Sequence, residues 1–167
     1  MPSPLETYRR FGEYLREGRY DRFAEVVDPE GYVENCVGMT GWTIGLDIAV
    51  ANFTQGIARA LTDLASDEQD VLETADSVVI RTRMAGTHTG TFLGVAPTGK
   101  RVTFDAVDWY RVGPDGRIAW RFLLCDWHSV RLQLLGEQPD LPQTPARVAV
   151  QASDAAVKEP GWTGDSS

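Results

Sequence analysis

The sequence is poor in the residues that metal sites and nucleic-acid sites require. It holds only two cysteines, Cys36 and Cys125, and two histidines, and their spacing matches neither a zinc site nor a disulfide framework. We therefore expect no metal, and we expect both cysteines to be free thiols. Acidic residues outnumber basic ones by 24 to 16, which gives a net charge of −8. Because nucleic-acid binding needs a basic patch, we expect no nucleic-acid partner.

Long hydrophobic runs are also missing. No stretch approaches the ~18 consecutive apolar residues of a membrane span, and the opening MPSPLETYRR lacks the apolar core of a signal peptide. We therefore expect no membrane association and a cytoplasmic location. Hydrophobic residues still make up 43% of the chain, and 167 residues fit one domain with a buried core.

The last thirty residues differ in character from the rest. Residues 138–167 are rich in proline, contain few large apolar side chains and show no clear hydrophobic period. Such a segment cannot bury enough apolar surface to fold by itself. We predict one folded domain over residues 1–137 and an extended or disordered tail over residues 138–167.

Residues 77–136 carry the clearest structural pattern. Two turn segments, GVAPTGK and GPDG, separate three stretches in which apolar and polar residues alternate. This pattern predicts three half-buried strands, followed by a short helix that ends at Gly136. Upstream, the spacing of apolar residues predicts helices over 5–18, 19–27 and 45–64 and strands over 32–39 and 63–76. Helices followed by mostly antiparallel strands indicate an α+β fold, in which a strongly curved sheet and its helices surround a pocket.

Each of the three strands places one ionisable residue on its more apolar face. These residues are His88, Asp108 and Asp126, and Asp126 shares its face with Trp120 and Phe122. Burying an unpaired charge is costly, so three such groups on adjacent strands predict a polar cluster at the floor of an apolar pocket. Burial would raise the pKa of Asp126 towards neutrality, as a general base requires. Structural roles are the alternatives: Asp126 as a helix N-cap, Asp108 as a hydrogen-bond acceptor and His88 as a core or surface residue.

The run GTHTGTFLGVAPTGKRVTFDAVDWYRVGPDGRI, with LLGE further on, resembles the SnoaL-like polyketide cyclases of the NTF2-like superfamily. The resemblance covers about residues 5–137 and implies a cone-shaped α+β fold. It further implies a cofactor-independent enzyme of antibiotic or other secondary metabolism, which closes a ring by an intramolecular aldol reaction. The general acid/base of that family is an aspartate in the last strand, which corresponds to Asp126. A family histidine corresponds to His88, and a family asparagine to Asn35.

One departure from the family keeps other functions open. The strand end that is polar in the polyketide cyclases reads WRFLLC here. An epoxide-opening cyclase, a hydrolase or an isomerase of the same fold is an alternative. Epoxide chemistry would use two acidic groups, and Asp108 and Asp126 could supply them. A non-catalytic small-molecule-binding module and a dimerising accessory protein are further alternatives.

We expect a small, hydrophobic, polycyclic or polyketide-like substrate, and a homodimer or homotetramer. The aromatic residues would hold a flat, conjugated molecule. The predicted substrate-binding residues are Asp108, Asn35, Tyr14, Trp42, Phe53, Met84, Phe104, Trp120 and Phe122.

Overall fold

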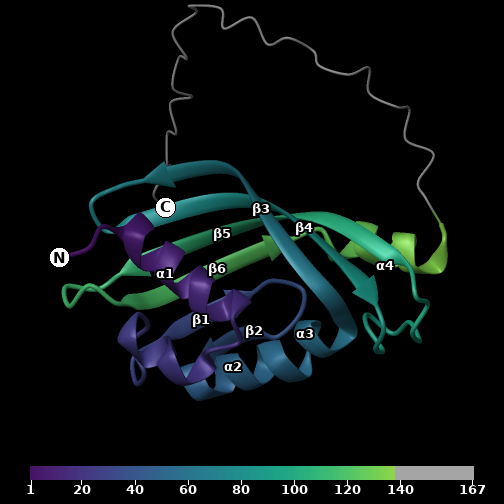
Figure 1. Ribbon diagram of the computed structural model, residues 1–167, viewed down its shortest axis with the longest axis horizontal. Coiled ribbons are helices and arrows are strands. Elements are labelled where there is room, and N and C mark those ends of the chain that lie inside the picture. Colours follow the sequence, from purple (N-terminus) through teal and green to yellow (C-terminus); the bar gives the residue numbers. More distant parts are fainter. Residues whose placement is uncertain (138–167) are drawn as a thin grey trace, which may run out of the picture.

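A six-stranded sheet dominates the computed structural model, which describes residues 1–137 (Figure 1). The strands are β1 (Val33–Cys36), β2 (Gly41–Ile44), β3 (Leu61–Glu73), β4 (Ser77–His88), β5 (Arg101–Val112) and β6 (Ile118–Cys125). They lie in the order β2-β1-β6-β5-β4-β3, and every neighbouring pair is antiparallel except β1 and β6. The strands predicted from the alternating pattern are confirmed, whereas the predicted tail lies outside the described residues.

Helices cover one face of this sheet. They are α1 (Pro4–Arg16), the 3₁₀ helix η1 (Tyr20–Glu25), α2 (Leu46–Gln55), α3 (Ile57–Ala60) and α4 (Trp127–Leu135). In Figure 1, α1 and α2 lie against the sheet and α4 sits at one end of it. The arrangement is an α+β fold with a mostly antiparallel sheet packed against helices, as the resemblance implies. None of the helices within residues 1–137 has the length and apolar character that a membrane crossing demands.

Two helix predictions need correction. The segment predicted as one helix over 45–64 forms α2 and α3, and its last residues already belong to β3. The break lies at Gly56, where a Cβ atom would come within 2.5 Å of the Asn52 carbonyl oxygen, so the backbone bend there requires glycine. The segment predicted as a helix over 19–27 contains the 3₁₀ helix η1.

An irregularity near the start of β6 decides which side chains face the helices. Val112 of β5 pairs with Ile118, but the next pair is Arg111 with Trp120, which leaves Ala119 without a partner on β5. One extra residue in a strand reverses the alternation of side chains beyond it.

Beyond Ala119, the inner face of β6 therefore carries Arg121, Leu123 and Cys125, which line a cavity under the helices. Trp120 and Phe122 instead point to the outer face. The prediction that these two aromatic residues lie on the core face is wrong, because the pattern of β6 gave no sign of the extra residue.

Candidate active site

A cavity of about 170 Å³ lies between the inner face of the sheet and the helices. Helix α1 contributes Phe11 and Leu15 to its wall, and α2 contributes Phe53. The sheet contributes Met84 from β4 and Phe104 from β5. The wall is therefore largely apolar, as expected for a site that holds a small hydrophobic molecule.

One polar cluster interrupts this apolar wall, and its centre is Arg121. The Arg121 Nε–H donates to Asp108 Oδ1 at 2.7 Å, and Nη1 donates to Glu34 Oε2 at 3.3 Å. The Tyr32 hydroxyl donates to the same Glu34 oxygen at 3.0 Å. The side chains of Arg121, Asp108 and Glu34 are only 18%, 13% and 6% exposed. One guanidinium is thus held between two buried carboxyl groups.

Strand register explains why these residues meet. Arg121 on β6 lies opposite Tyr110 on β5 and opposite Glu34 on β1. Asp108 is two residues from Tyr110 along β5, so it projects from the same face and is a diagonal neighbour of Arg121. The cluster requires the β5–β6 hairpin and a third strand, β1, that is distant in sequence, and the parallel β1–β6 pairing completes it.

The charge state of the cluster follows from burial and proximity. Burial opposes the charged form of Arg121, but Asp108 together with the nearby Tyr110 and Tyr32 outweighs it, and the pKa of Arg121 lies well above its ordinary value. Burial also raises the pKa of Tyr32 and Tyr110 well above the ordinary value of a tyrosine. Arg121 therefore stays cationic, and both phenols stay neutral hydrogen-bond donors.

Both cysteines line the cavity and are free, as predicted. Burial raises the pKa of Cys125 to about 12 and also raises that of Cys36. Because the thiolate is the reactive form of cysteine, neither thiol is activated as a nucleophile. Within residues 1–137, no group of three or more histidine, cysteine, aspartate or glutamate side chains is arranged to hold a metal ion.

The predicted site residues fall into two groups. Asp108, Phe53, Met84 and Phe104 line the cavity. The lining residues do not include Asp126, His88, Asn35, Tyr14, Trp42, Trp120 or Phe122.

Asp126 is the N-cap of α4 and is exposed. Its carboxylate accepts the Ser129 backbone N–H at 3.0 Å and the Ser129 hydroxyl at 2.6 Å. These hydrogen bonds lower the pKa of Asp126, so the predicted rise towards neutrality is wrong. The geometry agrees with the alternative role, a helix cap.

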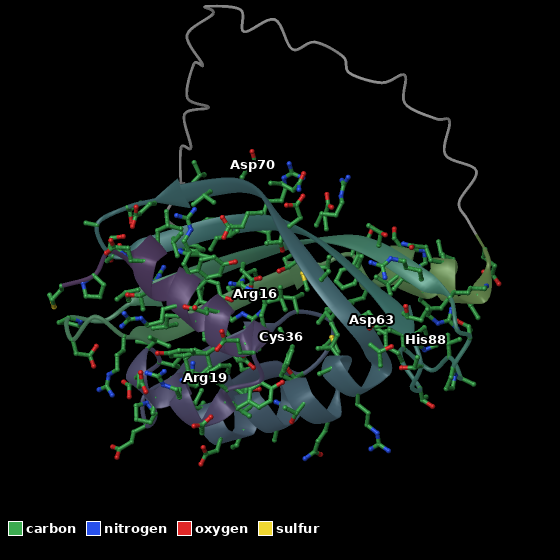
Figure 2. The ribbon with its side chains drawn as sticks, in the orientation of Figure 1. Arg16, Arg19, Cys36, Asp63, Asp70 and His88 are labelled. Carbon is green, nitrogen blue, oxygen red and sulfur yellow. The ribbon has the colours of Figure 1, made fainter. Side chains whose placement is uncertain are left out.

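His88 is completely buried at the end of β4 and holds a loop rather than facing the cavity. Its Nδ1 accepts the Thr98 backbone N–H at 3.2 Å, which fixes the return of the chain towards β5. Figure 2 shows His88 well away from Cys36, one of the cavity residues. This placement agrees with the core-residue alternative.

The remaining predicted residues point elsewhere. Tyr14 is buried between α1 and η1, and its hydroxyl donates to Glu25 at 2.9 Å. Trp42 is 62% exposed. Asn35 lies between Glu34 and Cys36 in β1, and these two line the cavity, so Asn35 faces the other side of the sheet.

Sequence reasoning missed Arg121, Glu34 and Tyr32. For two of them a signal existed: in the run YVENC, Tyr32 and Glu34 alternate with other residues and so share one face of a short strand. An acidic residue between Tyr32 and Cys36 on a core-facing side is the pattern that identified Asp108. Arg121 had no such signal. The alternating pattern places it on the outer face, and the extra residue Ala119 turns it to the inner face.

Comparison with solved structures identifies relatives of the same fold. A candidate SnoaL-like polyketide cyclase from Jannaschia sp. CCS1 is 22% identical, with a TM-score of 0.69 over 80% of this chain and 94% of that one. IdmH from Streptomyces antibioticus, a candidate polyketide cyclase, is 26% identical, with a TM-score of 0.62 over 80% and 96%. AclR from Streptomyces galilaeus, a candidate hydroxylase, is 25% identical, with a TM-score of 0.54 over 68% of each chain.

Comparison with curated proteins gives no match. The family described as SnoaL-like polyketide cyclase matches residues 5–134. This range includes all six strands, the helices η1, α2 and α3, and all the residues of the Arg121 cluster. The chain belongs to the SnoaL-like polyketide cyclase family.

Proposed function

We propose that the protein closes a ring in a small polyketide-like substrate by an aldol-type reaction without a cofactor, with Asp108 as the general base. The observation that carries this proposal is the Asp108–Arg121–Glu34 cluster on the wall of an apolar cavity. The family supports a cyclase-type activity. Asp108 replaces Asp126 in the proposed role because Asp108 lines the cavity and Asp126 does not.

The contacts of Asp108 suit proton abstraction. Arg121 Nε–H donates a hydrogen bond to Asp108 Oδ1. The other carboxylate oxygen, Oδ2, can then take a proton from an acidic carbon of the substrate. The electron pair of that C–H bond moves to the adjacent carbonyl oxygen and forms an enolate. No hydrogen bond to Arg121 Nη2 occurs within residues 1–137, so this nitrogen can donate to the enolate oxygen. An apolar wall strengthens that interaction because it excludes water.

Ring closure then completes the reaction. The enolate carbon attacks a second carbonyl carbon of the same molecule, and the new alkoxide takes up one proton. The proton removed from carbon is returned to oxygen, so the product is an isomer of the substrate. The apolar wall holds the chain folded so that both carbonyl groups meet.

Epoxide opening is the second candidate, and the pairing of Asp108 and Glu34 through Arg121 favours it specifically. One carboxylate would accept a proton from the attacking water or hydroxyl, while the other, as the acid, would protonate the epoxide oxygen. NTF2-like folds host many reactions in one pocket, so the substrate decides between the two candidates.

The test is turnover of a panel of polycyclic β-keto esters and polycyclic epoxides, with Asp108→Asn compared with Asp126→Asn. Asp108→Asn should lower turnover by at least ~100-fold, the usual contribution of a general base. Asp126→Asn should keep full turnover, since asparagine also caps helices well. Full turnover by Asp108→Asn would contradict the proposal, and tight binding without turnover by wild type would favour a binding module.

A further inference from the structure

Tyr8 lies close to the polar cluster, where the cavity adjoins a second, more polar groove. It projects from α1 and lines both the cavity and the adjoining groove, which α1 forms with Glu68. The Tyr8 ring centroid lies 5.2 Å from that of Tyr110, and the guanidinium carbon of Arg121 lies 5.5 Å from the Tyr110 centroid. Tyr8 and Arg121 therefore both pack against the Tyr110 ring.

The Tyr8 hydroxyl is free to bind a ligand. No hydrogen bond joins it to another residue within the described part of the chain, and its side chain is only half-buried. Within residues 1–137, the buried polar side-chain atoms that lack a hydrogen-bond partner are Thr82 Oγ1 and His88 Nε2. The Tyr8 oxygen is not one of them, so it is unpaired but accessible. Within residues 1–137, the cavity wall thus presents the Tyr8 phenol, like that of the more deeply buried Tyr110, without a hydrogen-bond partner.

The charges around Tyr8 keep this phenol protonated. Burial raises the pKa of Tyr8 to about 12, and the negative charges of Asp108 and Glu68 act in the same direction. Arg121 and Arg16 oppose the rise without cancelling it. A neutral phenol facing an apolar cavity is a strong hydrogen-bond donor to a developing oxyanion.

We propose that Tyr8 is a catalytic residue whose hydroxyl binds the substrate carbonyl oxygen that becomes a hydroxyl group on ring closure. This inference rests on the proposed function. As the carbon–carbon bond forms, the electron pair of the C=O double bond moves to oxygen, which takes the Tyr8 proton. The phenolate then recovers the proton that Asp108 removed from carbon, so both residues return to their starting state.

The proposal also narrows the substrate. Asp108 projects from β5 in the sheet, whereas Tyr8 projects from α1 on the opposite wall. A molecule that uses both must present an acidic C–H group to the sheet and a second carbonyl oxygen to the helix. This requirement describes a folded dicarbonyl compound.

The test uses two ligands that differ only in a carbonyl group, 1-tetralone and tetralin, and two variants of one helix. Tyr8→Phe removes the free hydroxyl, and Tyr14→Phe removes a hydroxyl that is bonded to Glu25 outside the cavity lining. Wild type should bind the ketone about 5- to 10-fold more tightly than the hydrocarbon, as one hydrogen bond provides. Tyr8→Phe should lose this preference, and Tyr14→Phe should keep it.

Two further readouts separate a catalytic role from a structural one. The carbonyl stretch of bound 1-tetralone should shift to lower frequency in wild type and in Tyr14→Phe, but not in Tyr8→Phe. The melting temperature should fall in Tyr14→Phe, which loses a hydrogen bond, and should stay unchanged in Tyr8→Phe.

Each contrary result is decisive. If Tyr8→Phe keeps the ketone preference and the frequency shift, or if wild type shows neither, the role of Tyr8 is overturned. If Asp108→Asn loses turnover while Tyr8→Phe keeps it, the inference about Tyr8 fails and the proposed function stands. If wild type turns over no substrate yet shows a Tyr8-dependent ketone preference, the proposed function fails and Tyr8 remains a ligand-binding residue.

Discussion

Arg111 and Arg121 lie on neighbouring strands of one hairpin, yet they serve opposite faces of the sheet. Arg111 is exposed on the outer face, where its guanidinium carbon lies 4.8 Å from the centroid of Trp109 and 4.9 Å from that of Trp120. Arg121 is buried on the inner face, where it bonds to Asp108 and Glu34. The same side chain thus stacks on aromatic rings on one face and neutralises carboxyl groups on the other.

The comparison shows which face can carry chemistry. On the outer face, water screens Arg111, and its contacts with Trp109 and Trp120 contribute modestly. On the inner face, burial strengthens every electrostatic interaction of Arg121. The aromatic residues that look most like a substrate platform in the sequence therefore lie on the face opposite the cavity, and the less conspicuous face holds the candidate site.

The largest expected effect comes from exchanging each arginine for methionine. Arg121→Met leaves Asp108 and Glu34 buried without their cation, which should lower the free energy of unfolding by about 3–5 kcal/mol. Arg111→Met removes only exposed stacking and should cost about 1 kcal/mol or less. Urea unfolding of both variants measures the difference. Equal losses would show that the two faces do not differ in their electrostatic environment.

Part of this contrast was predictable from the sequence and part was not. Strands β4 and β5 alternate regularly, so Met84, Phe104 and Asp108 were placed correctly on the inner face. In β6 both faces are hydrophobic, and the aromatic side of the run WRFLLC looked like the core. The unpaired Ala119 reverses that choice. No periodicity argument reveals a single extra residue in a strand.

The fold as a whole was easier to predict than the site. Alternation and turn residues located the long strands, and the family resemblance supplied their cone-like arrangement. The cluster, in contrast, depends on β1 lying parallel to β6, which brings Glu34 to Arg121. That contact joins residues 87 positions apart, and local sequence patterns contain no information about such pairs.

The next largest effect on stability is expected at Asp126, which follows the end of β6. Asp126→Ala removes the N-cap of α4 and should lower the free energy of unfolding by about 1 kcal/mol. Because hydrogen bonds to Ser129 lower the pKa of Asp126 in the folded state, its charge stabilises the protein above the ordinary pKa of an aspartate. That stabilisation is lost as the pH falls through the lowered value.

Unfolding experiments on wild type and Asp126→Asn at neutral and at strongly acidic pH measure this dependence. Asparagine can still cap the helix but carries no charge. The two proteins should differ at neutral pH and converge in strong acid. A difference that grows in acid would contradict the cap.

Thr82 tests what an unpaired polar group on the inner face costs in stability. Its hydroxyl is buried and has no hydrogen-bond partner among residues 1–137, whereas the buried Thr7 hydroxyl donates to the Gly116 carbonyl oxygen at 3.2 Å. Thr82→Val removes an unpaired polar group and should raise the free energy of unfolding by about 1 kcal/mol, while Thr7→Val should lower it by about as much. Thermal unfolding measures both. A loss of stability in Thr82→Val would show that the hydroxyl has an unseen partner, such as a buried water molecule.

The outer face offers the smallest effect on stability. Leu124 and Ile44 are 49% and 68% exposed there, close to Trp109 and Trp120. Exposed apolar patches of this kind commonly mark contacts between proteins, and we place the predicted homodimer or homotetramer contact on this face, with a second copy of the chain as the partner. Leu124→Asp should change the free energy of unfolding of the monomer by no more than about 0.5 kcal/mol.

The same variant should nevertheless lower the molar mass measured by light scattering, because a carboxylate at the centre of an apolar contact loses its hydration. Ile48→Asp makes the same change in charge at an exposed apolar residue of α2, on the helical side, and should leave the molar mass unchanged. If wild type is already monomeric, or if both variants keep its mass, the outer face is not a contact between copies. The edge-to-face pair of Trp109 and Trp120 would then serve only to cover the outer side of the strands that hold Arg121 and Asp108, and the two faces would differ in chemistry but not in partners.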